Sequence, residues 1–166
     1  ISADAGGRVW IAGMFKGRAA FGGETFHTTG DKDNDGFIAH YNTRGELQWA
    51  RHLHGPATDY CLGIANDGHG TGFVTGEFTD TATFAGATLK SQGSTDIFTA
   101  ALDDTGHLSW ITVTGGVKGD NAYTMAYQPN GHLFIAGACV APATFGSKKL
   151  ENGGGADLYS AKIKVK

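Results

Sequence analysis

The chain repeats one pattern three times along its length. The segments VWIAGMF, GFVTGEF and LFIAGAC are near-copies that align at Ile11, Val74 and Ile135. Their spacing corresponds to a period of 61 to 63 residues. A fixed period of this kind indicates an architecture of equivalent units, each packed on its neighbours. It also predicts that most of the repeated residues serve packing rather than chemistry.

The repeat extends well beyond this segment. An Asp that precedes an apolar stretch recurs at Asp35, Asp96 and Asp157, and a Gly-x-Leu-x-Trp segment recurs at 45–49 and 106–110. When the chain is aligned with itself on these segments, it divides into three repeats of one structural unit, at about 1–58, 59–119 and 120–166. The first repeat has two additional residues, which the alignment places in the loop around 31–34.

Each repeat is predicted to form four short antiparallel strands. In the second repeat they cover about 60–66, 72–78, 95–102 and 107–114, and 82–85 with 87–91 adds a small hairpin. No segment has the periodicity of an amphipathic helix. We therefore expect an all-β chain whose four-stranded blades stack radially as a β-propeller. A β-sandwich is the alternative, but a sandwich does not require the same four-strand unit three times.

The second repeat carries a recognisable family pattern. The segments LGIANDGHGTGFVTGEF, ATFAGATL and TDIFTAALDDTGHLSW resemble the repeat of the bacterial SBBP-type β-propeller family. The resemblance covers almost the whole chain. It implies exported, multi-bladed bacterial propellers, often in large surface proteins of unassigned function, and it implies little about activity.

Three repeats are fewer than the four or more blades that close a propeller ring. The chain begins inside the first predicted strand of its first repeat and ends after the third strand of its last repeat. Both ends are therefore expected to carry unpaired strand edges that can pair with another chain. The chain is then part of a longer propeller, or it pairs with copies of itself into a ring or filament, or it is a stable open array. The expected partners are the remaining blades, another protein or a second copy.

Charge and composition indicate which further classes of partner are not expected. The net charge is −3 and no basic run exists, so nucleic acid is not expected to bind. No apolar stretch approaches the roughly 18–20 residues that span a bilayer. Charged residues make up only 17% of the chain, which suits a secreted or cell-surface bacterial repeat protein.

The most distinctive local motif is the acidic turn at 31–36. Asp31, Asp33 and Asp35 have the D-x-D-x-D-G spacing that wraps carboxylate oxygens around Ca²⁺. An EF-hand loop would need a Glu where Asn42 stands. Because Asp35 also has counterparts in the other repeats, a solvated acidic turn is the simpler interpretation, and calcium is the alternative.

A second group of polar residues precedes the predicted innermost strands. Asp59-Tyr60 and Asp120-Asn121 occupy equivalent positions, and Tyr123 follows. Propellers commonly bind ligands at the mouth of the central channel, so these five residues are the predicted ligand site. The alternative is that the Asp residues cap turns by accepting nearby backbone N–H groups.

Other candidate residues favour structural roles. A disulfide between Cys61 and Cys139 is conceivable in an exported protein, but two small buried residues are the simpler interpretation. His52 and His54 are expected to be exposed on an outer strand, since two ligands alone do not make a zinc site. The three Trp residues could form a sugar-stacking platform, but their recurrence at apolar positions favours packing between blades.

No catalytic motif such as G-x-S-x-G or H-E-x-x-H is present. We therefore expect a non-catalytic, exported or cell-surface propeller that acts as a scaffold or binding surface. One alternative is a carbohydrate-binding propeller with several equivalent inter-blade pockets. Another is a self-assembling structural subunit, and a third is a segment of an enzyme whose catalytic residues lie elsewhere in a longer chain.

Overall fold

The computed structural model describes residues 1–30, 33–151 and 154–165. These residues form fifteen β-strands and no helix, so the all-β prediction is confirmed. It follows that the described part of the chain contains no helix that could cross a membrane. Paired strands are antiparallel throughout, and each sheet is open because its strand order begins and ends on different strands.

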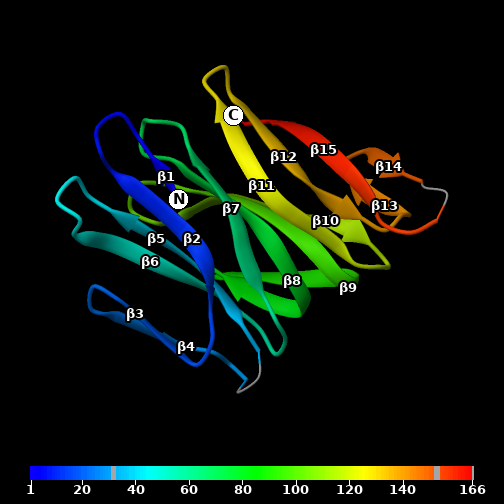
Figure 1. Ribbon diagram of the computed structural model, residues 1–166, viewed down its shortest axis with the longest axis horizontal. Coiled ribbons are helices and arrows are strands. Elements are labelled where there is room, and N and C mark those ends of the chain that lie inside the picture. The colour runs from blue at the N-terminus through cyan, green and yellow to red at the C-terminus, as the bar shows by residue number, and fades with distance from the viewer. Residues whose placement is uncertain (31–32, 152–153, 166) are drawn as a thin grey trace.

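The strands fall into three groups that follow the three sequence repeats (Figure 1). The first group contains β1 (Ser2–Ala3), β2 (Val9–Phe15), β5 (Asp35–Tyr41) and β6 (Leu47–His54), with a side hairpin of β3 (Arg18–Phe21) and β4 (Glu24–His27). The second contains β7 (Tyr60–Asn66), β8 (Gly72–Phe84), β9 (Ala87–Leu102) and β10 (Leu108–Gly116). The third contains β11 (Asp120–Gln128), β12 (His132–Cys139) and β15 (Asp157–Lys164), with a hairpin of β13 (Ala143–Phe145) and β14 (Lys148–Leu150).

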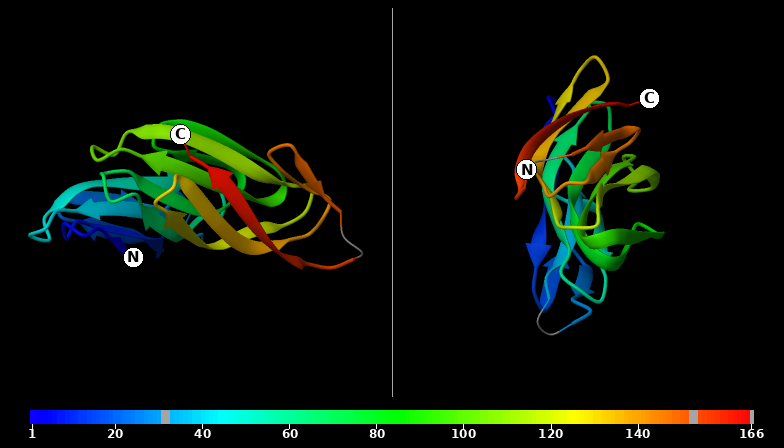
Figure 2. Two further views of the ribbon diagram at one scale, coloured as in Figure 1. Left: turned by 90° about the horizontal axis from the view of Figure 1, so that it is seen from above. Right: turned by 90° about the vertical axis from the view of Figure 1, so that its right-hand side faces the viewer.

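Within each group the strands pair in chain order. The orders are β1-β2-β5-β6, β7-β8-β9-β10 and β11-β12-β15. The third group therefore lacks a described counterpart of β6 and β10. Two further views show that β15 runs along the outside of the molecule (Figure 2).

The hairpin predicted at 82–85 and 87–91 forms, but as the continuation of β8 and β9 rather than as separate strands. The strands are therefore longer than the predicted 72–78 and 95–102. Pairing continues because the register shifts between Thr79 and Thr81, where Asp80 has a left-handed φ of 63°. Asp tolerates this conformation better than most residues do.

The hairpin tips join neighbouring groups. Leu53 and His54 of β6 pair with Phe84 and Thr83 of β8. One period later, Gly115 and Gly116 of β10 pair with Thr144 and Ala143 of β13. The same connection thus recurs at both junctions between repeats.

Apolar side chains fill both junctions. One cluster joins the first and second repeats, and its largest members are Trp10, Ile38, Trp49, Leu53, Phe78, Phe84, Phe98 and Leu102. A second cluster joins the second and third repeats and contains Ala65, Phe73, Ile97, Ala101, Ala122, Met125, Leu133 and Ile135. The packing role predicted for the Trp residues is confirmed for Trp10 and Trp49, which are buried, and Trp110 packs against the second cluster.

The cysteines are free and buried, as the simpler interpretation predicted, and the alternative disulfide does not form. Cys61 lies in the cluster between the first and second repeats. Burial raises the pKa of the Cys61 thiol well above its usual range, so this residue is unreactive at neutral pH.

The repeated segment has a Gly at the same position in every copy, at Gly13, Gly76 and Gly137. In two of the three copies the neighbouring backbone leaves no room for a side chain. At Gly76 a Cβ would collide with the carbonyl oxygen of Tyr60, and at Gly137 it would collide with that of Asn121. Both collisions lie beside a register shift of the innermost strand. The shift falls between Cys61 and Gly63 in β7 and between Ala122 and Thr124 in β11. These bulges bring the neighbouring backbone close enough that only Gly fits.

We predict that Gly76→Ala and Gly137→Ala each lower the free energy of unfolding by about 2–4 kcal/mol, because backbone must move to admit the methyl group. The matched control is Gly13→Ala. A methyl group at Gly13 would meet only the ring of Phe37, with Cε1 at 2.9 Å, and that ring can shift. Urea denaturation followed by circular dichroism measures all three, and equal losses would contradict this explanation.

Candidate binding sites at the repeat junctions

Each junction between repeats buries a pair of aspartates. Asp35 and Asp59 lie between the first and second repeats, and Asp96 and Asp120 occupy the same positions one period later. All four are fully buried. Their proximity at the second junction is clear from Gly115, where a Cβ would collide with Oδ1 of Asp96 and lie 2.9 Å from Oδ2 of Asp120. The junctions therefore hold carboxyl groups that solvent does not reach.

The Asp that precedes each innermost strand has a structural task. Asp59 accepts a hydrogen bond from the backbone N–H of Thr79 at 3.3 Å, and Asp120 accepts one from the N–H of Val140 at 3.1 Å. Asp120 accepts a second from the N–H of Gly116 at 2.7 Å. Both carboxyl groups thus tie the start of the innermost strand to backbone 20 residues further along the same repeat, which is not the local turn cap of the alternative interpretation. Only the bond from Gly116 to Asp120 is local.

The acidic turn and the start of β7 form one cluster, although they are separate motifs in the sequence. The backbone N–H of Asp59 donates to the carbonyl of Asn34 at 2.8 Å. The side chain of Asn34 donates to the hydroxyl of Tyr60 at 3.3 Å. Asn34 therefore joins the acidic turn to the start of the next repeat, while Asp31 lies outside the described residues.

Asp35 is not part of a solvated turn, and that expectation is wrong for this residue. The carboxyl group is fully buried. Its Oδ2 lies 2.8 Å from Nε2 of His52. His52 and His54, expected to be exposed, are only partly exposed, since the rings of Phe15 and Phe26 lie against His52.

Burial determines the protonation of this cluster. It raises the pKa of Asp35 to about 6 and that of Asp59 to about 7, and the neighbouring charge of Asp35 contributes to the shift of Asp59. Burial lowers the pKa of His52 to about 4, so its imidazole is neutral at pH 7. The contact between His52 and Asp35 is therefore a hydrogen bond from Nε2–H to the carboxylate rather than an ion pair.

Two carboxyl oxygens of this cluster, Oδ1 of Asp35 and Oδ2 of Asp59, are buried without a hydrogen-bond partner. However, the described residues contain no group of three or more His, Cys, Asp or Glu side chains arranged to hold a metal ion. Calcium binding at Asp31, Asp33 and Asp35 stays a prediction.

The other three residues of the predicted ligand site, Tyr60, Asn121 and Tyr123, lie in different environments. Tyr60 is partly buried against Asn34, and the amide of Asn121 donates to the carboxyl group of Glu77. Tyr123 is 54% exposed and sits at the bulge of β11, between Ala122 and Thr124. Because Asp59 and Asp120 are fully buried, only Tyr123 of the five residues offers a large exposed surface.

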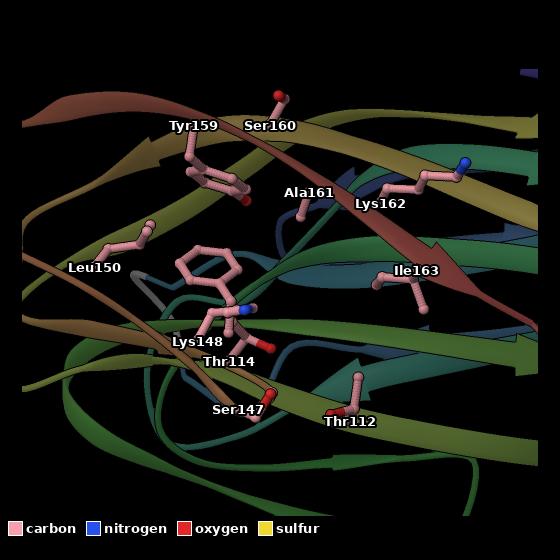
Figure 3. A pocket seen from close by; sticks show the side chains of 12 residues that line it. Thr112, Thr114, Ser147, Lys148, Leu150, Tyr159, Ser160, Ala161, Lys162 and Ile163 are labelled. Atoms are coloured by element: carbon pink, nitrogen blue, oxygen red, sulfur yellow. The ribbon is translucent and has the colours of Figure 1, made fainter.

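A cavity lies elsewhere, between the outer strands of the second and third repeats. It has a volume of about 540 Å³. We call it the β15 groove. One wall is β10 with Thr112 and Thr114, the floor is the hairpin 145–150, and the other wall is β15 with Tyr159, Ala161 and Ile163. Tyr159, Ala161 and Ile163 point toward the groove, whereas Ser160 points away from it (Figure 3).

Sequence reasoning did not identify this groove. Its walls come from three segments, and the residues that line it occupy positions that are packed in the other repeats. The only available signal was the third repeat itself, in which the alignment finds no equivalent of the segment 106–110. That signal predicted an open strand edge but not a cavity beside it.

No protein-family model matches the chain, and no curated protein matches it either.

The buried carboxyl pair makes stability depend on pH. In the unfolded chain Asp59 has the usual pKa of 3.8, and in the folded chain about 7. The folded state therefore holds a proton that the unfolded state releases, so stability is lost as the pH rises through about 7. We predict that unfolding costs about 1 kcal/mol more at pH 6 than at pH 8 from this group, since one pKa unit corresponds to ~1.4 kcal/mol.

The comparison of wild type with Asp59→Asn isolates this effect. His52 acts in the opposite direction, because its lowered pKa favours the unfolded state as the pH falls below about 6.5. That contribution is shared by both proteins and cancels. Urea midpoints at pH 6, 7 and 8 should vary less in Asp59→Asn. An identical pH profile in the two proteins would show that Asp59 is ionised in the folded state.

Proposed function

We propose that the three repeats are blades of β-propeller type and that the chain acts as a scaffold or binding surface rather than as an enzyme. The observation that carries this proposal is the equivalence of the two junctions. Each has a buried Asp pair, an apolar cluster and a paired hairpin tip at positions one period apart. Residues that recur in the sequence are thus engaged in packing one repeat on the next.

Contacts across the junctions support stacking of the repeats face to face. The ring of Phe73 in the second repeat stacks on Tyr127 in the third, with centroids 5.3 Å apart and an interplanar angle of 17°. The indole N–H of Trp49 in the first repeat donates to the carbonyl of Asp104 in the second at 2.9 Å. Aromatic contacts of this kind add to the free energy of apolar burial.

An exported, bacterial cell-surface location is part of the proposal. Its support is the resemblance to SBBP-type repeats and the low proportion of charged residues, 17%. In such a protein, the repeats would serve to build an extended surface, and specificity would reside in loops and grooves rather than in a conserved catalytic centre.

The carbohydrate-binding alternative receives less support. It predicts equivalent pockets between successive blades. The β15 groove has no open counterpart between the first and second repeats, since Leu53, Phe84 and Leu89 are buried there.

Self-assembly through the end repeats is a second candidate, and exposed apolar residues favour it. Leu158 is 88% exposed, whereas its counterpart Ile97 is 2% exposed under the third repeat. Phe134 is 40% exposed, whereas its counterpart Phe73 is 3% exposed. The outer face of the third repeat therefore presents the apolar positions that the second repeat buries against its neighbour.

The propeller proposal predicts that the repeats are modular. A second copy of residues 59–119 inserted after Gly119 should fold as one more blade, and the chain should unfold in one transition at a higher urea concentration. The added junction buries more apolar surface, and in stacked repeats stability grows with each interface. A lower midpoint, or a separate transition for the inserted copy, would contradict the proposal.

The self-assembly candidate predicts a discrete multiple of the 17.3 kDa chain mass, or an open series of multiples, in size exclusion coupled to light scattering. Leu158→Glu should return the protein to a monomer, because a charge would enter the contact face. The control is Val117→Glu, which changes an apolar residue that is 66% exposed in the loop between β10 and β11. A monomeric wild type, or equal effects of both variants, would exclude assembly through this face.

A further inference from the structure

The β15 groove has a counterpart between the first and second repeats, and there the space is filled. Ile111 and Val113 of β10 pack against the apolar cluster that contains Phe84 and Phe98. They reach this cluster because β10 pairs with β9 along its length. In a repeat with all four strands, the fourth strand is therefore the element that covers this face.

The third repeat retains the apolar residues of this face but leaves them only partly covered. Phe145 and Tyr159 occupy the positions of Phe84 and Phe98, and their rings lie 4.6 Å apart between centroids. Phe84 and Phe98 are fully buried, whereas Phe145 and Tyr159 are not. Leu150 and Ala161 likewise are half-buried where Leu89 and Ala100 are buried.

One edge of β15 is also free for pairing. β15 pairs with β12 over eight residues, from His132↔Lys164 to Cys139↔Asp157. Within 1–30, 33–151 and 154–165 it pairs with no other strand. Its outer backbone N–H and C=O groups therefore form a template to which an extended segment can add.

We propose that the β15 groove and the free edge of β15 together accept one extended segment with the fourth-strand pattern of this chain's own repeats. The incoming strand would pair antiparallel with β15 and place two apolar side chains, two residues apart, in the groove. In the register of β9 with β10, Ile111 stands opposite Ala100 and Val113 opposite Phe98. The same register on β15 sets these side chains opposite Ala161 and Tyr159.

The two fourth strands of this chain differ in how well they fit this pattern. β10 has Ile111 and Val113 at the two inward positions, whereas β6 has Ala50 and His52. A groove of about 540 Å³ with a largely apolar lining favours the larger aliphatic pair. The proposal rests on the proposed propeller function, since it assumes that the third repeat is a blade.

The test uses the full chain and a fluorescein-labelled peptide of residues 106–116, GHLSWITVTGG, followed by fluorescence anisotropy. We expect saturable binding, and slower hydrogen exchange of the backbone amides of β15 when the peptide is bound. The peptide of residues 45–55, GELQWARHLHG, should bind roughly tenfold or more weakly, because its inward side chains are small or polar.

Matched variants locate the interaction. In the peptide, Ile111→Asp should weaken binding by at least roughly tenfold, whereas Thr112→Asp should not, since residue 112 alternates to the opposite face of the strand. In the chain, Ala161→Arg should abolish binding by placing a charge in the groove. Ser160→Arg should retain it, because Ser160 points away from the groove (Figure 3). Thermal melts of both chain variants establish that they are folded.

The outcomes separate this inference from the propeller proposal. Absence of binding, while the amides of β12 are protected from exchange, would overturn the inference and leave the blade intact. Unprotected amides in β12 would show that the third repeat is not a blade, and both proposals would fail. Binding that Ala161→Arg does not change would place the peptide elsewhere. A further outcome is that the wild-type chain self-associates, that this association blocks the peptide, and that Ala161→Arg abolishes it. A second copy would then be the occupant of the β15 groove, and the inference would be overturned.

Discussion

Burial of apolar side chains between successive repeats is the interaction on which the rest of the structure depends. The second repeat shows it most fully, because β9 is buried from Asp96 to Leu102, with the first repeat on one face and the third on the other. β15 has the same sequence pattern, but the described residues place no repeat on its outer face, and its residues alternate between exposed and partly buried. A repeat of this kind cannot bury both faces alone, so stability arises from its neighbours.

The same burial explains the unusual chemistry of the junctions. Asp35 and Asp96 are fully buried where another repeat packs over them, whereas their counterpart Asp157 is exposed at the outer face of the third repeat. The sequence position is equivalent in all three, so the difference lies in what covers it. The first two repeats have a fourth strand, β6 or β10, and a following repeat, and the described part of the third repeat has neither. Removing water from these carboxyl groups raises the pKa values of Asp35 and Asp96, and it leaves them as structural rather than solvated acids.

Much of the fold could be predicted because it depends on local pattern and on repetition. The strand predicted at 60–66 matches β7, and the hairpin around Gly86 forms between β8 and β9 as expected. The length of β8 and β9 was not predicted, since it depends on pairing across the register shift at Asp80. Local composition at 79–81 does not reveal that the two strands re-pair beyond it.

The sites were less predictable, because they form between repeats. The acidic turn and Asp59-Tyr60 were separate motifs in the sequence, and only packing of the second repeat on the first brings Asn34 and Tyr60 together. The partial burial of His52 was also not predicted, and it comes from Phe15 and Phe26, which lie against its ring within the first repeat. The equivalence of Asp59 and Asp120 was visible, and their shared bonding to backbone N–H groups accords with it. The β15 groove depends on the relative placement of β10, β15 and a hairpin, which no single segment encodes.

The central claim is that successive repeats pack face to face through equivalent contacts. The most direct measurement is a nuclear Overhauser spectrum with selectively labelled Phe and Tyr residues. The rings of Phe73 and Tyr127 belong to different repeats and lie 5.3 Å apart between centroids, so cross-peaks between their ring protons are predicted. Well-dispersed signals from both rings without such cross-peaks would show that the second and third repeats fold but do not pack in this way, and the account would be wrong.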